Sequence, residues 1–134
     1  MRVIIVDDEI TSSQVLEKLI QHYLPNLQVI AVCNKPAEAI EKISELNPDL
    51  VFMDLQMPEV DGYTAVREIR RSETAGVHIP IIALTASAIK GELEKCLEAG
   101  MDDLICKPVE PKVLESVLRR FLAGENLKMP DKTG

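Results

Sequence analysis

The sequence predicts an α/β domain with a five-stranded parallel sheet and helices on both faces. Two observations support this: short apolar runs alternate with segments of helical periodicity along the chain, and turn residues bound most runs. Such alternation covers both faces of a parallel sheet with helices, joined by right-handed crossovers. A length of 134 residues suits one domain with a core of its own.

The expected strands are residues 3–6, 27–33, 50–54, 79–85 and 103–106. The third is apolar until its last residue, Asp54, which is typical of a strand buried on both faces. The second is less regular and is expected nearer an edge of the sheet. Pro80 lies near the start of the fourth, where a missing N–H removes only an end donor.

The segments between and after these strands show apolar residues at helical spacing. A hydroxyl within 11–13 is expected to cap the first helix, Pro36 suits the first turn of the second, and Gly100 suits a left-handed end to the fourth. The expected apolar faces are Val15, Leu16, Leu19, Ile20, Tyr23 and Leu24; Ala39, Ile40, Ile43 and Leu46; Tyr63, Val66 and Ile69; Ile89, Leu93, Cys96 and Leu97; and Val113, Leu114, Val117, Leu118, Phe121 and Leu122.

Composition argues against several classes of function. A net charge of −7 disfavours a nucleic-acid-binding surface, and 3% aromatic residues disfavour base stacking. No stretch reaches the ~20 apolar residues of a membrane span, and the first residues lack the layout of a signal peptide. Cys33, Cys96 and Cys106 match no CxxC spacing and suit a reducing compartment. We therefore expect a cytoplasmic location, no membrane partner and no direct nucleic-acid binding.

Polar residues meet at one edge of the predicted sheet. Asp7 and Asp8 follow the first strand, Asp54 ends the third, Thr85 ends the fourth, and Lys107 follows the fifth. In open α/β sheets, ligands bind just outside the carboxyl ends of the strands. Taken alone, Asp54 is better explained as an aspartate that caps the next turn. Its position at the same edge as the other four residues favours a functional site instead.

These residue types suit phosphoryl chemistry. Three neighbouring carboxylates repel one another, so that one holds a proton or a cation joins them, and oxygen-only ligands suit Mg²⁺ or Mn²⁺. Asp54 can attack phosphorus and become an acyl phosphate, while the metal and Lys107 neutralise charge and Thr85 bonds a phosphoryl oxygen. A cis bond before Pro108 would aim Lys107 over the strand ends. The simpler alternatives are that Asp7 or Asp8 is an anion at the start of a helix, and that Lys107 is a solvent-exposed lysine in a loop.

Five motifs resemble the receiver domain of two-component response regulators over residues 1–123. They are Val6-Asp7-Asp8-Glu9, Met53-Asp54-Leu55-Gln56-Met57-Pro58 with Asp61-Gly62, Ala83-Leu84-Thr85-Ala86, Ala99-Gly100-Met101-Asp102-Asp103, and Lys107-Pro108. The resemblance implies the flavodoxin-like strand order 2-1-3-4-5 and phosphorylation of Asp54. It implies Mg²⁺ held by Asp8, Asp54 and the backbone carbonyl of Gln56, with Asp7 acting largely through water. Thr85 and Lys107 would read out the phosphoryl group, and the donor would be a histidine kinase or a histidine phosphotransfer protein.

The resemblance has one departure, at Leu104. Receivers often place Tyr or Phe three residues before the lysine, where it rotates as the threonine moves; Leu104 has no ring but can still change rotamer into vacated space. Gln56 and Ser87 occupy positions that influence water access to the acyl phosphate in the family. Neither is an obvious base, so slow self-dephosphorylation is expected. Partner docking is expected around residues 11–15 and at the strand-end loops.

Several alternatives stay open. Residues 2–62 resemble receivers that precede DNA-binding domains, whereas 83–108 resemble receivers of hybrid sensor kinases. Residues 124–134 are expected to be a poorly ordered tail or linker, too short for an output domain, so an output partner or a missing C-terminal effector domain is implied. A homodimer through the fourth and fifth helices is possible.

Two other functions are weaker. A phosphatase of the haloacid dehalogenase type needs a second Asp where this chain has Gln56, and no turnover of a separate substrate is expected. A phosphate-independent interaction module usually lacks an acidic residue or the lysine, and this chain has all of them.

Overall fold

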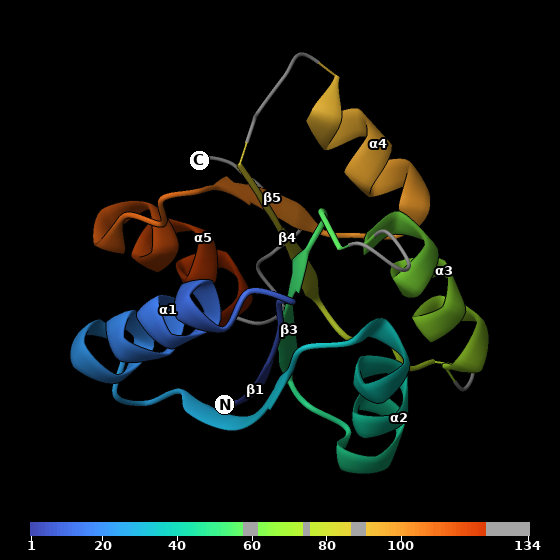
Figure 1. Ribbon diagram of the computed structural model, residues 1–134, viewed down its shortest axis with the longest axis horizontal. Helices are drawn as coiled ribbons and strands as arrows, with labels where there is room; N and C mark the ends of the chain where they lie inside the picture. The colour runs from blue at the N-terminus through green and yellow to red at the C-terminus, as the bar shows by residue number, and fades with distance from the viewer. Residues whose placement is uncertain (58–61, 74–75, 87–90, 123–134) are drawn as a thin grey trace.

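The computed structural model describes residues 1–57, 62–73, 76–86 and 91–122. Within these ranges five strands form one parallel sheet in the order β2-β1-β3-β4-β5 (Figure 1). The strands are β1 (Arg2–Val6), β2 (Gln28–Cys33), β3 (Leu50–Asp54), β4 (Ile81–Thr85) and β5 (Asp103–Cys106). The predicted α/β class, strand order and edge position of β2 are confirmed.

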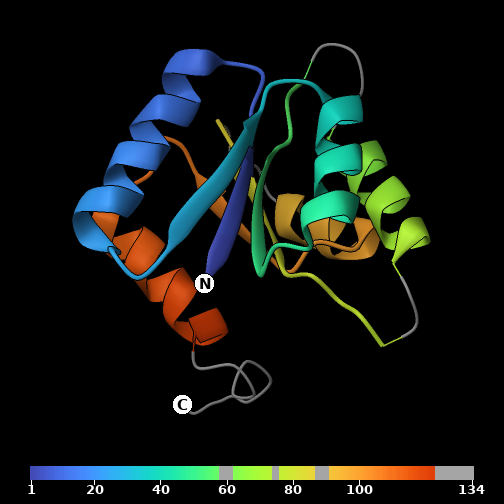
Figure 2. The same cartoon turned by 90° about the horizontal axis from the view of Figure 1, so that it is seen from below.

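Helices cover both faces of the sheet, as predicted. They are α1 (Ile10–Tyr23), α2 (Pro36–Leu46), α3 (Gly62–Ser72), α4 (Glu92–Ala99) and α5 (Pro111–Leu122). Figure 2 shows α1 and α5 on one face and α2, α3 and α4 on the other. The sheet therefore separates two apolar cores.

The central strand β3 contributes to both cores. Leu50 and Phe52 pack with α1 and α5, whereas Val51 and Met53 pack with α2, α3 and α4. All four side chains have no exposed surface, and each such burial contributes about 1.5–3 kcal/mol. This anchoring fixes the end of β3, and with it the position of Asp54.

The expected start of the first helix is wrong. Helix α1 begins at Ile10 after Glu9, and Glu9 makes no side-chain capping bond. The Ser13 hydroxyl lies inside the helix and donates to the Ile10 carbonyl at 2.8 Å. The reason lies upstream, because the Asp7 carboxylate accepts the Glu9 N–H at 2.9 Å and turns the chain into the helix earlier.

Several residues of the expected apolar faces are exposed instead. Val15 and Tyr23 on α1, Leu93 and Leu97 on α4, and Val113 on α5 are each 42–53% exposed. The buried face of α4 is formed by Cys96 and Ala99. Helical spacing thus identified the helices but overestimated the width of their buried faces.

Other boundaries agree closely with expectation. Pro36 is in the first turn of α2, and Gly100 ends α4 with a φ of 110°, in the left-handed region that favours glycine. Strand β4 begins at Ile81, so Pro80 precedes it. Among the described residues, no helix is both long and apolar enough to span a membrane. Pro58, Asp61, Ser87, Ile89 and the tail 124–134 lie outside the described residues.

Candidate functional site

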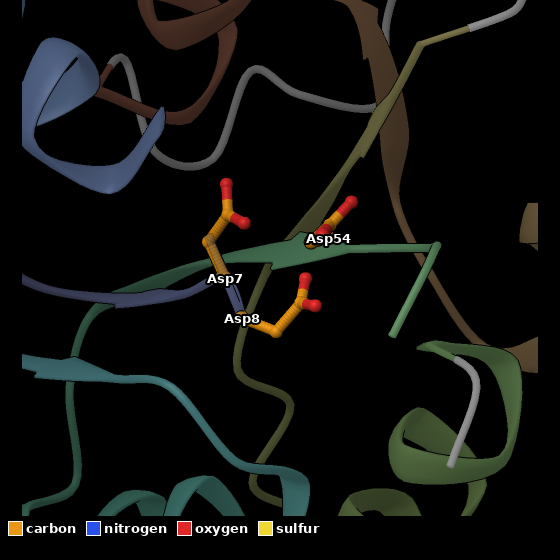
Figure 3. A group of neighbouring side chains, drawn as sticks. All are labelled: Asp7, Asp8 and Asp54. Carbon is orange, nitrogen blue, oxygen red and sulfur yellow. The ribbon is translucent and has the colours of Figure 1, made fainter. Parts of the chain in front are cut away.

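Three carboxylates gather where β1 and β3 end (Figure 3). Asp7, Asp8 and Asp54 each offer an oxygen atom, and these atoms lie within 4.8 Å of one another. Asp7 and Asp54 are 1% and 2% exposed, and Asp8 is more exposed. The parallel register explains the proximity, because Val6 pairs with Met53 and the next residues in each strand therefore lie side by side.

Backbone contacts orient the two buried carboxylates. The Asp7 Oδ1 atom accepts the Glu9 N–H, and the Asp54 Oδ1 atom accepts the Gln56 N–H at 3.2 Å. The Leu55 N–H donates to the Leu84 carbonyl at 3.0 Å, which continues the β3–β4 ladder past Asp54. Each carboxylate is therefore held by the turn that follows it.

Lys107 reaches over the same edge from the end of β5. Its Nζ atom lies 3.1 Å from Asp7 Oδ2 and 3.6 Å from Asp54 Oδ1. The Lys107 N–H donates to the Thr85 carbonyl at 2.7 Å, and the peptide bond to Pro108 is cis, as the sequence suggested. Among the described residues, the ammonium thus contacts two of the three carboxylates, and the three carboxylates together give the site excess negative charge.

Burial and the neighbouring negative charge both favour the protonated form of Asp54. Burial, then the charge of Asp7, raises the pKa of Asp54 from its ordinary value of 3.8 to about 7, against the lowering effects of the Gln56 N–H and of Lys107. Burial opposes the charge of Lys107, but its contacts with Asp7 and Asp54 outweigh this effect and raise its pKa. A cation that replaced the proton on Asp54 would relieve the repulsion.

The donor atoms suit a hard divalent cation. A pocket of about 390 Å³ opens over the carboxylates and is lined by Asp8, Glu9, Asp54, Gln56, Ala86 and Lys107. Its potential ligands are carboxylate and backbone oxygens, which Mg²⁺ and Mn²⁺ prefer, and no thiol or imidazole is found among the described residues that line it. The residues present therefore fit a Mg²⁺ ion together with a small anionic group.

Thr85 directly precedes Ala86, which lines this pocket, and Leu104 lies on the neighbouring strand β5. Thr85 is 2% exposed at the end of β4 and pairs with Cys106. Leu104 pairs with Ala83, two residues earlier in both strands. Leu104 is half-buried and packs against the core under α2, α3 and α4. All the sequence-predicted site residues therefore lie at or next to the same sheet edge.

Comparison with known families agrees with this geometry. The model of the response regulator receiver domain family matches residues 3–119. The chain belongs to this family. Receiver domains of this kind act in two-component and phosphorelay signalling.

Relatives of this receiver domain include large kinases. It is 32% identical over 137 residues to the osmosensing histidine protein kinase SLN1 of Saccharomyces cerevisiae, covering 98% of the chain and 11% of the kinase. It is 33% identical over 127 residues to the signal transduction histidine-protein kinase BarA of Escherichia coli, covering 95% of the chain and 13% of BarA. The chain thus spans only a small part of these relatives.

A solved structure resembles the domain closely. It is the receiver domain of the sensor histidine kinase PA1611 from Pseudomonas aeruginosa, with a magnesium ion coordinated in its active site cleft. The TM-score is 0.79 and the identity 33%, over 92% of this chain and 98% of that domain. Similarity at this level supports the fold.

Sequence reasoning assigned no role to two residues next to this receiver site. The Asn34 Nδ2 atom donates to the Asp7 carbonyl at 2.8 Å, and a Cβ on Gly62 would lie 2.7 Å from the Asp54 carbonyl oxygen. Asn34 follows β2 at the same sheet edge, so its place after an expected strand was a usable signal. The contact at Gly62 depends on how α3 returns to β3, which periodicity does not show.

Proposed function

We propose that this receiver domain is a phosphorylation switch in which Asp54 accepts a phosphoryl group from a phosphohistidine donor. The observation that carries the proposal is the position of Asp54, a buried carboxylate 3.6 Å from the Lys107 ammonium and facing an open pocket. A carboxylate becomes a good acceptor when fixed positive charge faces the transferring oxygens.

The step needs the ionised form of Asp54. A carboxylate oxygen of Asp54 attacks phosphorus, the bond from phosphorus to the donor's ring nitrogen breaks, and that nitrogen keeps the electron pair. Mg²⁺, held by Asp8, Asp54 and the Gln56 carbonyl with Asp7 nearby, would supply positive charge for the phosphoryl oxygens, and Mn²⁺ fits the same donors. Lys107 stabilises the product by pairing with a phosphoryl oxygen.

Readout of the acyl phosphate is assigned to Thr85 and its neighbours. Thr85 ends β4 directly before Ala86, which lines the pocket, and from there its hydroxyl would bond a phosphoryl oxygen. Its movement would leave space that the half-buried Leu104 side chain can enter. The phosphorylated population would then favour a repacked β4–β5 edge.

A docking surface for the donor lies beside Lys107. Ile10 and Val15 on α1 are 61% and 53% exposed, next to a groove of about 460 Å³. The groove is lined by Glu9, Thr11, Ser12, Val15, Leu16, Leu84, Lys107, Pro108 and Val109. An apolar surface of this kind suits a helix that presents a phosphohistidine, either from a histidine kinase or from a histidine phosphotransfer protein.

Incubation with acetyl phosphate and Mg²⁺, followed by intact-mass measurement, tests the proposal. We expect one added phosphoryl group, none in Asp54→Asn, and none with EDTA. After the donor is removed the added mass should persist, since Gln56 is no base; a half-life of seconds would contradict this. Absence of the added mass in the wild type would refute the proposal, and repeated turnover of a phosphate ester would instead indicate a phosphatase.

A further inference from the structure

We propose that Asn34 is a positioning residue for the cation ligands, acting through the peptide bond between Asp7 and Asp8; this inference rests on the proposed function. Asn34 is the first residue after β2, the edge strand next to β1. It is half-buried and lies outside the pocket over Asp54, so it is not itself a ligand.

Asn34 extends the pairing of β1 and β2 beyond the end of the strands. The ladder ends where Val6 pairs with Cys33, and the Asp7 N–H still donates to the Cys33 carbonyl at 3.0 Å. The Asn34 Nδ2 atom then donates to the Asp7 carbonyl at 2.8 Å. Both backbone polar groups of Asp7 are therefore tied to the end of β2.

The Asp7 carbonyl belongs to the peptide that leads into Asp8. Fixing its oxygen fixes the plane of that peptide, and so the direction in which Asp8 leaves the chain. The carboxylate of Asp7 is held separately, by the Glu9 N–H at Oδ1 and by Lys107 at Oδ2. In the described part of the chain, Asn34 is thus the side chain that orients the backbone between the two acidic residues.

Orientation matters because of the geometry that Mg²⁺ requires. This ion accepts oxygen ligands in a near-octahedral arrangement at about 2.0–2.1 Å, so a rotated ligand is poorly tolerated. Loss of groups that orient metal ligands typically weakens metal binding by about 10- to 100-fold. Asn34 is itself held by its N–H, which lies 3.4 Å from Glu38 Oε1 on α2.

The test is titration calorimetry with MgCl₂ on folded variants, checked by far-UV circular dichroism. Asn34→Asp keeps the shape of the side chain but removes the donor, while its charge would by itself attract Mg²⁺. We expect binding about tenfold weaker all the same. Asn34→Ala carries the same expectation without a new charge. Asn34→His restores an N–H at the same bond separation from Cβ and should recover affinity to within about threefold of wild type.

Two further readouts separate positioning from general damage. In the acetyl phosphate reaction, the Mg²⁺ concentration for half-maximal rate should rise about tenfold in Asn34→Ala, with the rate at saturating Mg²⁺ within about twofold of wild type. Glu38→Gln, which keeps an acceptor for the Asn34 N–H, is the matched control and should bind Mg²⁺ within about threefold of wild type.

The outcomes distinguish the two proposals. The role of Asn34 is overturned if Asn34→Asp and Asn34→Ala bind Mg²⁺ as tightly as wild type. It is also overturned if the rate at saturating Mg²⁺ falls while the Mg²⁺ concentration for half-maximal rate stays unchanged. In both cases the proposed function stands. If the wild type binds no Mg²⁺ and gains no phosphoryl mass, the proposed function itself fails.

Discussion

The buried carboxylate of Asp54 should make the stability of the cation-free domain depend on pH. Its pKa is raised from 3.8 to about 7, so between about pH 4 and 7 the folded chain holds a proton that the unfolded chain has lost. More protons are bound in the folded state over this window, and the free energy of unfolding therefore falls as pH rises. A shift of this size corresponds to about 4 kcal/mol in full.

Asp54→Asn replaces the carboxylate by a neutral group of the same shape and removes this dependence. At pH 5 Asp54 in the folded wild type is still largely protonated. The wild type should then be only about 1.5–2 kcal/mol less stable than the variant. At pH 8 the ionised Asp54 should make it about 4 kcal/mol less stable. The difference between the two proteins should thus grow by about 2–3 kcal/mol.

Urea unfolding followed by circular dichroism, with EDTA present, measures this difference. Glu94→Gln, which removes an exposed carboxylate on α4, serves as the control for the loss of one charge. Addition of Mg²⁺ at pH 8 should narrow the gap between wild type and Asp54→Asn, since a ligand that binds the folded state stabilises it. A gap that stays constant from pH 5 to 8 would show that burial and Asp7 do not raise the pKa of Asp54.

Three further predictions concern Mg²⁺ binding, Gly62 and Arg70. Below pH 7, Mg²⁺ must displace a proton from Asp54. Calorimetry should therefore find that the dissociation constant for Mg²⁺ rises by up to about tenfold for each pH unit by which the pH falls. A dissociation constant that does not change with pH would contradict this. Gly62→Ala puts a Cβ 2.7 Å from the Asp54 carbonyl oxygen and should cost about 1–3 kcal/mol in urea unfolding and slow phosphorylation, whereas unchanged values would mean that α3 shifts freely. Arg70 bridges Glu73 and Asp102 at 2.7 and 2.9 Å with a largely buried guanidinium, so Arg70→Met should cost about 3 kcal/mol; a loss below 1 kcal/mol would show that the network is dispensable.

The sheet and its acidic edge were predictable because both follow from local signals. Apolar runs that end in Asp7, Asp54 or Thr85 indicate strand ends, and parallel strands bring such ends together whatever the details of the helices. The order of the strands was a separate matter, since only the resemblance to receivers implied it. That Asp7 and Asp54 end neighbouring strands was already expected from the parallel sheet, and the observed order places them on the adjacent strands β1 and β3.

The features that were not predicted depend on contacts between distant residues. The start of α1 is set by the Asp7 carboxylate rather than by a hydroxyl at 11–13. Val15 has helical spacing but lies outside the core, since the face of α1 that meets the sheet is narrow. Arg70 reads as an ordinary helix-surface arginine, yet its Nε atom donates to the Gly100 carbonyl at 2.8 Å, thirty residues away.

The contacts of Arg70 also bear on the proposed readout of a phosphorylated Asp54. Helix α4 is joined to α3 at both ends: the Tyr63 hydroxyl bonds the Glu92 carboxylate at its start, and Arg70 bonds the Gly100 carbonyl at its end. Its end is held more firmly, because the same guanidinium also pairs with Asp102. With leucine at 104 there is no aromatic ring to turn, so a response has to travel through packing. Under the proposed function, repacking at Leu104 would act more readily on the start of α4, where the described contact is the Tyr63–Glu92 hydrogen bond, than on its end, which the Arg70 network holds.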